Sequence, residues 1–113
     1  MTFSTFKAAT QELAIALLGV GAHAAVELLG SPVMSAAQPQ LTFRIGLSCP
    51  GLSTHDVQTA AAGRAIVRAA NLHWASLNLG MVHFISGSLA PSAQDGVVVF
   101  DVRMQPASYD HDA

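Results

Sequence analysis

The chain of 113 residues is long enough for one domain, and its formal net charge is −2 at pH 7. Hydrophobic residues make up 51% of it and charged residues only 11%, a combination that excludes intrinsic disorder. Five Lys and Arg residues are too few to follow a phosphate backbone, and one cysteine excludes both an internal disulfide and a multi-cysteine zinc site. Because a small domain normally needs surface charge to stay in solution, this shortage predicts that another subunit covers part of the surface.

The apolar run at residues 13–21 is the only stretch that resembles a targeting or membrane segment. It is shorter than a membrane span, and it is interrupted by glycines and followed by Glu27. Glu12 directly precedes it, which is unusual for a secretory signal. We therefore expect neither a signal peptide nor a contact with a membrane.

The first part of the chain predicts a helix over residues 4–19. Apolar residues recur there at helical spacing, and Ser4 or Thr5 can accept a hydrogen bond from a free backbone N–H at its start. Gly19 then ends the helix. A strand is expected next, over residues 24–29. The good helix formers in this segment leave a helix as the alternative to a strand hairpin over residues 22–40.

The clearest pattern of the chain lies at residues 41–49, where apolar residues alternate strictly with polar or small ones. This is typical of a strand with one buried face. The apolar residues are Leu41, Phe43, Ile45, Leu47 and Cys49. A second helix is expected over residues 54–76, opened by Ser53 and Asp56 in the spacing of a capping box.

Two further strands are expected at residues 81–86 and 97–104, separated by a segment that contains an Asp-Gly turn. The order α-β-β-α-β-β predicts an α+β fold, with the helices packed on one face of a mostly antiparallel sheet. Residues 1–107 are expected to form a single domain. The polar residues 108–113 are expected to form a flexible tail.

No residue pattern predicts a catalytic, cofactor or metal site. The histidines at positions 23, 55, 73, 83 and 111 lack the spacing of a helical zinc site. Cys49 ends the apolar strand face, where core packing is the ordinary role of a free cysteine. In the alternative, a nucleophile pair, His55 or His83 would be its base. We therefore expect a protein that is not an enzyme and holds no cofactor.

Four charged residues are candidates for contact between subunits. Arg64 and Arg68 lie one turn apart on the second expected helix, away from its apolar side. They are either solvated or bound to carboxylates of a neighbouring subunit, since arginine is the favoured interface cation. Asp101 and Arg103 lie on the polar face of the last strand, and Arg44 lies on that of the strand at residues 41–49. These three charges can pair within the sheet or across a subunit boundary.

The arrangement of these elements resembles the tail terminator proteins of long-tailed bacteriophages and of phage-like gene transfer agents. The resemblance lies in the alternating strand LTFRIGLSC, the Ala-rich helix that follows a Pro-Gly loop, and the last strands GMVHFISGSL and GVVVFDVRM. It is a resemblance of arrangement, because this family has no catalytic motif.

The resemblance implies a structural protein of the virion. Its copies would form a ring, commonly a hexamer, that caps the head-proximal end of the tail tube, stops tube polymerisation and docks to head-completion or neck proteins. Assembly would occur in the host cytoplasm, with no sequence-specific binding of nucleic acid, although DNA can pass through the lumen of the ring. A closed ring would also cover the surplus apolar surface.

Two other classes of function stay open. One is a different oligomeric component of the neck or tube. The other is a small ligand-binding or enzymatic domain of the ferredoxin-like or tautomerase-like kind, because small α+β folds carry many unrelated functions.

Overall fold

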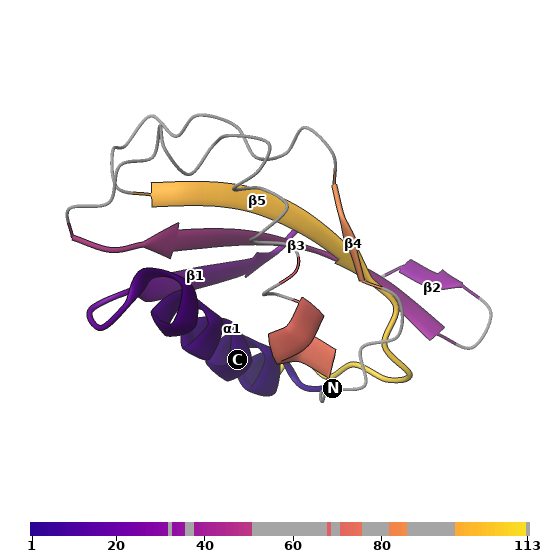
Figure 1. Cartoon of the computed structure of the whole chain (residues 1–113). Coiled ribbons are helices and arrows are strands. Elements are labelled where there is room, and N and C mark those ends of the chain that lie inside the picture. The colour runs from indigo at the N-terminus through magenta and orange to yellow at the C-terminus, as the bar shows by residue number, and fades with distance from the viewer. Residues whose placement is uncertain are drawn as a thin grey trace.

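In the computed structural model of the chain, an N-terminal helix packs on an antiparallel sheet, so the fold is α+β as expected (Figure 1). The structure describes residues 1–31, 33–35, 38–50, 68, 71–75, 82–85 and 97–112. Residues 71–74 are helical and belong to the second expected helix. Of that expected helix, the structure describes Arg68 and residues 71–75. Its other residues, which include His55 and Arg64, lie outside the described residues, and so does the Asp-Gly turn.

Helix α1 spans Phe3–Leu18, close to the expected range. Thr2 caps its start by accepting a hydrogen bond from the backbone N–H of Thr5, so the cap precedes both hydroxyl residues favoured by the sequence. The helix ends at Gly19, which has a φ of 98° and donates its N–H to the carbonyl of Ile15. The capping hydroxyl and the terminal glycine thus fix both ends of α1.

The sheet contains five strands in the order β1-β3-β5-β4, with β2 paired to the first residues of β3. The strands are β1 (His23–Leu28), β2 (Val33–Ser35), β3 (Gln38–Ser48), β4 (Val82–Phe84) and β5 (Val97–Met104). All pairings between them are antiparallel. The expected strands at residues 24–29, 41–49 and 97–104 are therefore confirmed to within a few residues. At 81–86, three residues form the strand.

The core lies between α1 and the inner face of the sheet. The alternation of β3 and β5 places every second residue on that face, where the apolar side chains are buried. They are Leu41, Phe43, Ile45, Leu47, Val98, Phe100, Val102 and Met104. Phe6 of α1 is completely buried, with its ring centroid 4.7 Å from that of Phe43 and 5.1 Å from that of Trp74. These three rings join α1, the sheet and the short helical segment into one core.

A β-hairpin made by β2 and the start of β3 projects beyond the rest of the sheet (Figure 1). Leu28 pairs with Phe43 and Val33 pairs with Gln40. The four residues 29–32 between β1 and β2 therefore lie opposite only two residues of β3, 41 and 42. Gly30, with a φ of 69°, allows the bend at this bulge. The sequence has no charged residue between Glu27 and Arg44, so the projecting hairpin is uncharged along its whole length.

The C-terminal residues 108–112 are held against the start of α1, which differs from the flexible tail expected from their polar composition. The N–H of Phe3 donates to the carbonyl of Asp110 at 2.9 Å, and the N–H of Asp110 donates to the carbonyl of Met1 at 2.9 Å. The His111 ring packs on Phe3 with a centroid distance of 4.4 Å. Backbone pairing and ring contacts, neither of which composition reveals, fix this segment.

Asp112 completes this attachment at the first turn of α1. Its carboxylate accepts hydrogen bonds from the backbone N–H of Ser4 at 2.8 Å and from the Ser4 hydroxyl at 2.6 Å. These two bonds lower the pKa of Asp112 below its ordinary value of 3.8. The carboxylate also suits the positive end of the helix dipole.

We expect the Asp112→Ala variant to be less stable than the wild type at neutral pH, by an amount that depends on pH. Because the pKa of Asp112 is lower in the folded protein, its stabilisation is complete above 3.8 and is lost as the pH falls through the folded value. Urea denaturation at a series of pH values measures this difference in the free energy of unfolding. Asp110→Ala is the control, since Asp110 pairs through its backbone. A difference that persists unchanged in strong acid would contradict the assignment.

Candidate functional site

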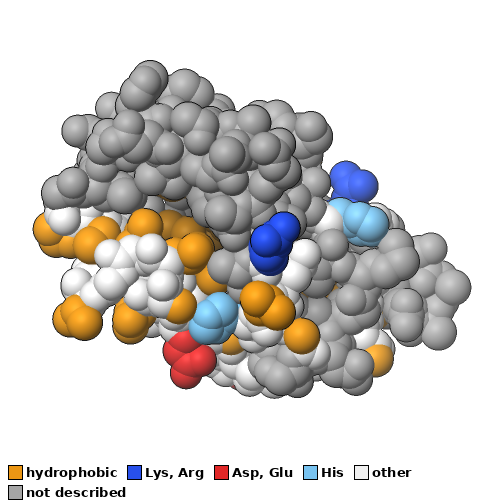
Figure 2. All heavy atoms as spheres, in the orientation of Figure 1, with side chains coloured by type: hydrophobic (Ala, Val, Ile, Leu, Met, Phe, Trp, Pro, Cys, Tyr) orange, Lys and Arg blue, Asp and Glu red, His pale blue; other side chains and the backbone are white. Residues whose placement is uncertain are grey.

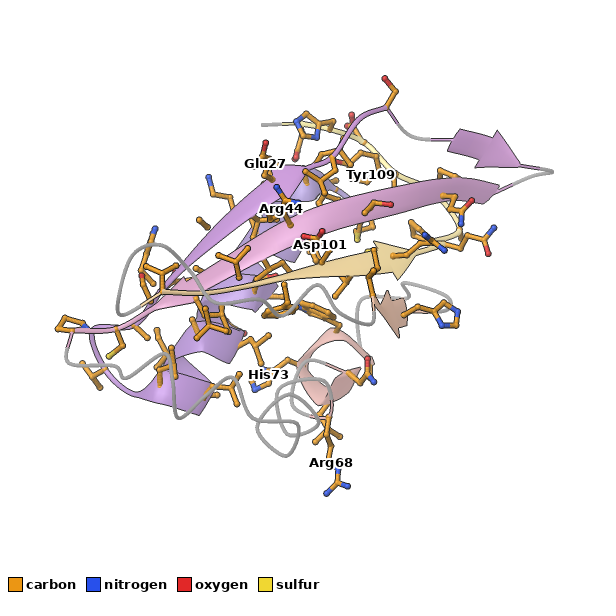
Figure 3. All side chains as sticks on the ribbon, turned by 90° about the horizontal axis from the view of Figure 1, so that it is seen from above. Glu27, Arg44, Arg68, His73, Asp101 and Tyr109 are labelled. Carbon is orange, nitrogen blue, oxygen red and sulfur yellow. The ribbon has the colours of Figure 1, made fainter. Side chains whose placement is uncertain are left out.

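The outer face of the sheet carries a row of alternating charges. Glu27 of β1 lies opposite Arg44 of β3, and Arg44 lies opposite Asp101 of β5. Figure 3 shows these three side chains gathered over the middle of the three strands. The strand register therefore places one cation between two carboxylates.

Arg44 and Asp101 form a two-point ion pair. Nε of Arg44 donates to one carboxylate oxygen of Asp101 at 3.0 Å, and Nη2 donates to the other at 3.3 Å. This bonding raises the pKa of Arg44 above its ordinary value, mainly through the hydrogen bond to Asp101. The Arg44 side chain is 50% exposed, and that of Asp101 only 16%. Asp101 was expected to pair either within the sheet or across a subunit boundary. In the structure its carboxylate is bound by Arg44 of the same sheet.

The other candidate interface residues are spread over the molecule. Arg103 is exposed on the outer face, opposite Thr42 and His83 in the strand register. Arg68 is exposed and points away from the sheet and from Asp101 (Figure 3). Arg64 lies outside the described residues.

The structure describes Cys49 and four histidines, of which His73 is half-buried in the short helical segment. Cys49 is half-buried just after β3, and its Sγ lies 3.7 Å from the carbonyl oxygen of Leu18. His23 and His83 are exposed on β1 and β4, and His111 contacts Phe3. Within the described residues, no group of three His, Cys, Asp or Glu side chains could hold a metal ion.

Large apolar side chains are exposed at three places. Val20 is 96% exposed in the turn after α1, Leu72 is 73% exposed on the short helical segment, and Ile15 is 44% exposed on α1. On the face that Figure 2 shows, hydrophobic side chains gather over α1, whereas charged side chains stand singly. Single exposed apolar side chains are normal on a protein surface, so these three residues do not by themselves mark an interface. No helix in the described part of the chain is long and apolar enough to span a bilayer.

One feature of this surface is left open by the sequence prediction, and another is missing from it. The partners of Arg44 depend on strand register, which the sequence leaves undetermined. The uncharged hairpin had a visible signal, because the sequence has no charged residue in the long interval between Glu27 and Arg44. Comparison with protein-family models, with curated proteins and with solved structures finds no match to this chain.

Proposed function

We propose that this protein is a structural virion protein, a tail terminator whose copies form a ring on the tail tube. The observation that carries the proposal is the uncharged hairpin of β2 and β3, which projects from the sheet (Figure 1). A projecting segment without charge gains little as a free surface in water, but it can bury its backbone and side chains against a neighbouring copy. Head-to-tail contacts of this kind close into a ring.

The full fold in this proposal has the order α-β-β-α-β-β, with the second helix over residues 54–76. Support comes from Trp74, which lies in the helical residues 71–74 and packs on Phe6 of α1. In this proposal both helices lie on the inner face of the sheet. The outer face is then left for the charge row and for contacts with other subunits.

The partners in this proposal are other copies of the same chain, in a ring of six, and the proteins above and below the ring. The tail tube protein lies on one side, and the head-completion or neck proteins lie on the other. The protein acts at the head-proximal end of the virion tail after assembly in the host cytoplasm, with no enzymatic activity and no cofactor. DNA passes through the lumen without sequence-specific contact.

Arginine side chains are proposed to join neighbouring subunits. In this proposal, Arg64 and Arg68 of one chain reach a carboxylate of the next chain. Asp101 and Arg103 lie on the outer face of the sheet of that next chain. Because Arg44 already binds Asp101, the exposed Glu27 is the more available acceptor. A desolvated pair of this kind contributes about 2–5 kcal/mol to association, as judged by removal of one partner.

The test is to purify the protein and to combine light scattering with class-averaged electron micrographs. We expect rings with an open centre and a mass several times 11.7 kDa. The double variant Arg64→Glu with Arg68→Glu should remain folded but fail to form rings. Lys7→Glu, which reverses one exposed cation on α1, is the control and should still assemble. A wild-type protein that stays at 11.7 kDa at high concentration would overturn the proposal.

A further inference from the structure

Strand β1 forms one outer edge of the sheet, and the direction of its backbone groups can be assigned. Residues of an antiparallel edge strand alternate, so that one residue bonds to the neighbouring strand and the next points both N–H and C=O outward. The N–H of Ala24 donates to Oε1 of Gln11 on α1 at 2.9 Å, so it points away from β3. Val26 and Leu28, at the same alternation, therefore also direct their backbone groups outward.

Gln11 protects only the beginning of this edge. Its Nε2 donates to the carbonyl of Ala22 at 2.9 Å, and its Oε1 accepts from Ala24, so one side-chain amide replaces a neighbouring strand there. Beyond this point, no residue of the described structure hydrogen-bonds to the outward backbone groups of Val26 and Leu28.

The rest of β1 has little to prevent pairing with another strand. Its sequence HAAVEL contains neither proline nor lysine, the residues that commonly protect an edge strand. The side chains of Val26 and Leu28 lie on the inner side of the sheet and are half-buried against the core. A strand added at this edge would therefore gain backbone hydrogen bonds and extend the apolar layer at the same time.

We propose that this edge binds β1 of a second copy of the chain, antiparallel and around a twofold axis at Val26. Each Val26 then exchanges two backbone hydrogen bonds with Val26 of the second copy, and each Leu28 N–H donates to the carbonyl of Ala24. The N–H of Ala24 keeps its bond to Gln11. The partner is thus an identical strand, and the contact is symmetric.

Charge disfavours one of the alternative registers. With Val26 on the axis, each Glu27 lies opposite Ala25 of the other copy, and His23 lies diagonally from Glu27. If the twofold axis lay at Glu27 instead of Val26, the two Glu27 side chains would lie directly opposite each other, which is unfavourable. The proposed register avoids that repulsion and uses the whole length from Ala24 to Leu28.

This pairing does not rest on the proposed ring. A twofold contact makes the two copies face opposite ways, whereas all subunits of a ring that caps a tube face the same way. The paired form would therefore be a state of the free protein, in which the open edge is covered before assembly. The contact is small, so we expect it to be weak and dependent on concentration.

The experiment uses the exposed residue Ala25, which can be changed without altering the backbone or the core. Ala25→Glu places a carboxylate opposite Glu27 of the second copy, and Ala25→Lys places a cation there. Sedimentation equilibrium over a concentration series should give a monomer–dimer equilibrium for the wild type. The dissociation constant should rise in Ala25→Glu and fall in Ala25→Lys, and the two variants should differ by about tenfold or more.

Amide hydrogen exchange gives an independent measurement on the wild type. The amides of Val26 and Leu28 should become protected as the concentration rises, while that of Ala24 is protected throughout by Gln11. Equal dissociation constants for the two Ala25 variants, or a wild type that stays monomeric, would overturn the proposal. Rings without twofold dimers would also overturn it while supporting the proposed function, and dimers without rings would do the opposite.

Discussion

Phe6→Ala should lower the free energy of unfolding by about 3–5 kcal/mol, the range for removing a buried aromatic ring. Phe6 is completely buried and its ring contacts both Phe43 and Trp74, so its loss opens a cavity where α1, β3 and the short helical segment meet. Domains of this size are stable by only about 5–15 kcal/mol, so the variant should be close to unfolding at ordinary temperature.

Trp74 provides the measurement, because it is the only tryptophan of the chain and it is buried beside Phe6. Urea unfolding followed by its fluorescence should show a lower midpoint for Phe6→Ala with a similar slope. Phe6→Leu keeps most of the buried volume and should cost clearly less. Lys7→Ala, at the exposed neighbouring position, is the control for helix propensity. A cost below about 1 kcal/mol for Phe6→Ala would mean that the three rings do not form the centre of the core.

The parts of the fold that the sequence predicts correctly are those with a strong periodic pattern. In β3 and β5, strict alternation gave both the strands and the faces that are buried, because a half-buried sheet imposes that period directly. In α1, the spacing of apolar residues gave the helix to within a residue. Its cap was misplaced because Thr2, Ser4 and Thr5 can each supply the same hydroxyl, and only the entering backbone decides between them.

The parts that sequence reasoning missed depend on pairing between distant residues. The tail residues 108–112 are polar, yet their backbone groups pair with the first residues of the chain and Asp112 binds Ser4. Composition describes side chains and cannot reveal such backbone pairing. The three-residue strand β2 is likewise too short to show a period, and it exists because β3 continues past the bulge to receive it.

The same limit applies to the candidate site. The sequence named Asp101 and Arg103 as charges on a strand face, and the structure shows which cation Asp101 binds. Register decides this, because a shift of β3 against β5 by two residues would have placed Thr42 or Gly46 opposite Asp101 instead of Arg44. Charge patterns on strands thus give the face on which a side chain lies, while the partner requires the fold.

Trp74→Phe should be far less costly than Trp74→Ala, although both remove a large part of a buried side chain. Nε1 of Trp74 is buried without a hydrogen-bond partner in the described structure, and an unpaired buried donor costs about 1–3 kcal/mol. Phenylalanine removes that donor and retains a ring beside Phe6, so the loss of apolar area and the relief of the unpaired N–H act in opposite directions.

Trp74→Ala leaves no ring beside Phe6. It removes the donor together with the whole ring, and we expect it to cost about 3–5 kcal/mol. Because both variants lose the fluorescent probe, unfolding is followed by far-ultraviolet circular dichroism, with Leu72→Ala at the neighbouring exposed position as the control. If phenylalanine is as destabilising as alanine, then the indole N–H is satisfied in solution, and the ring of Trp74 is held by a polar contact as well as by packing on Phe6.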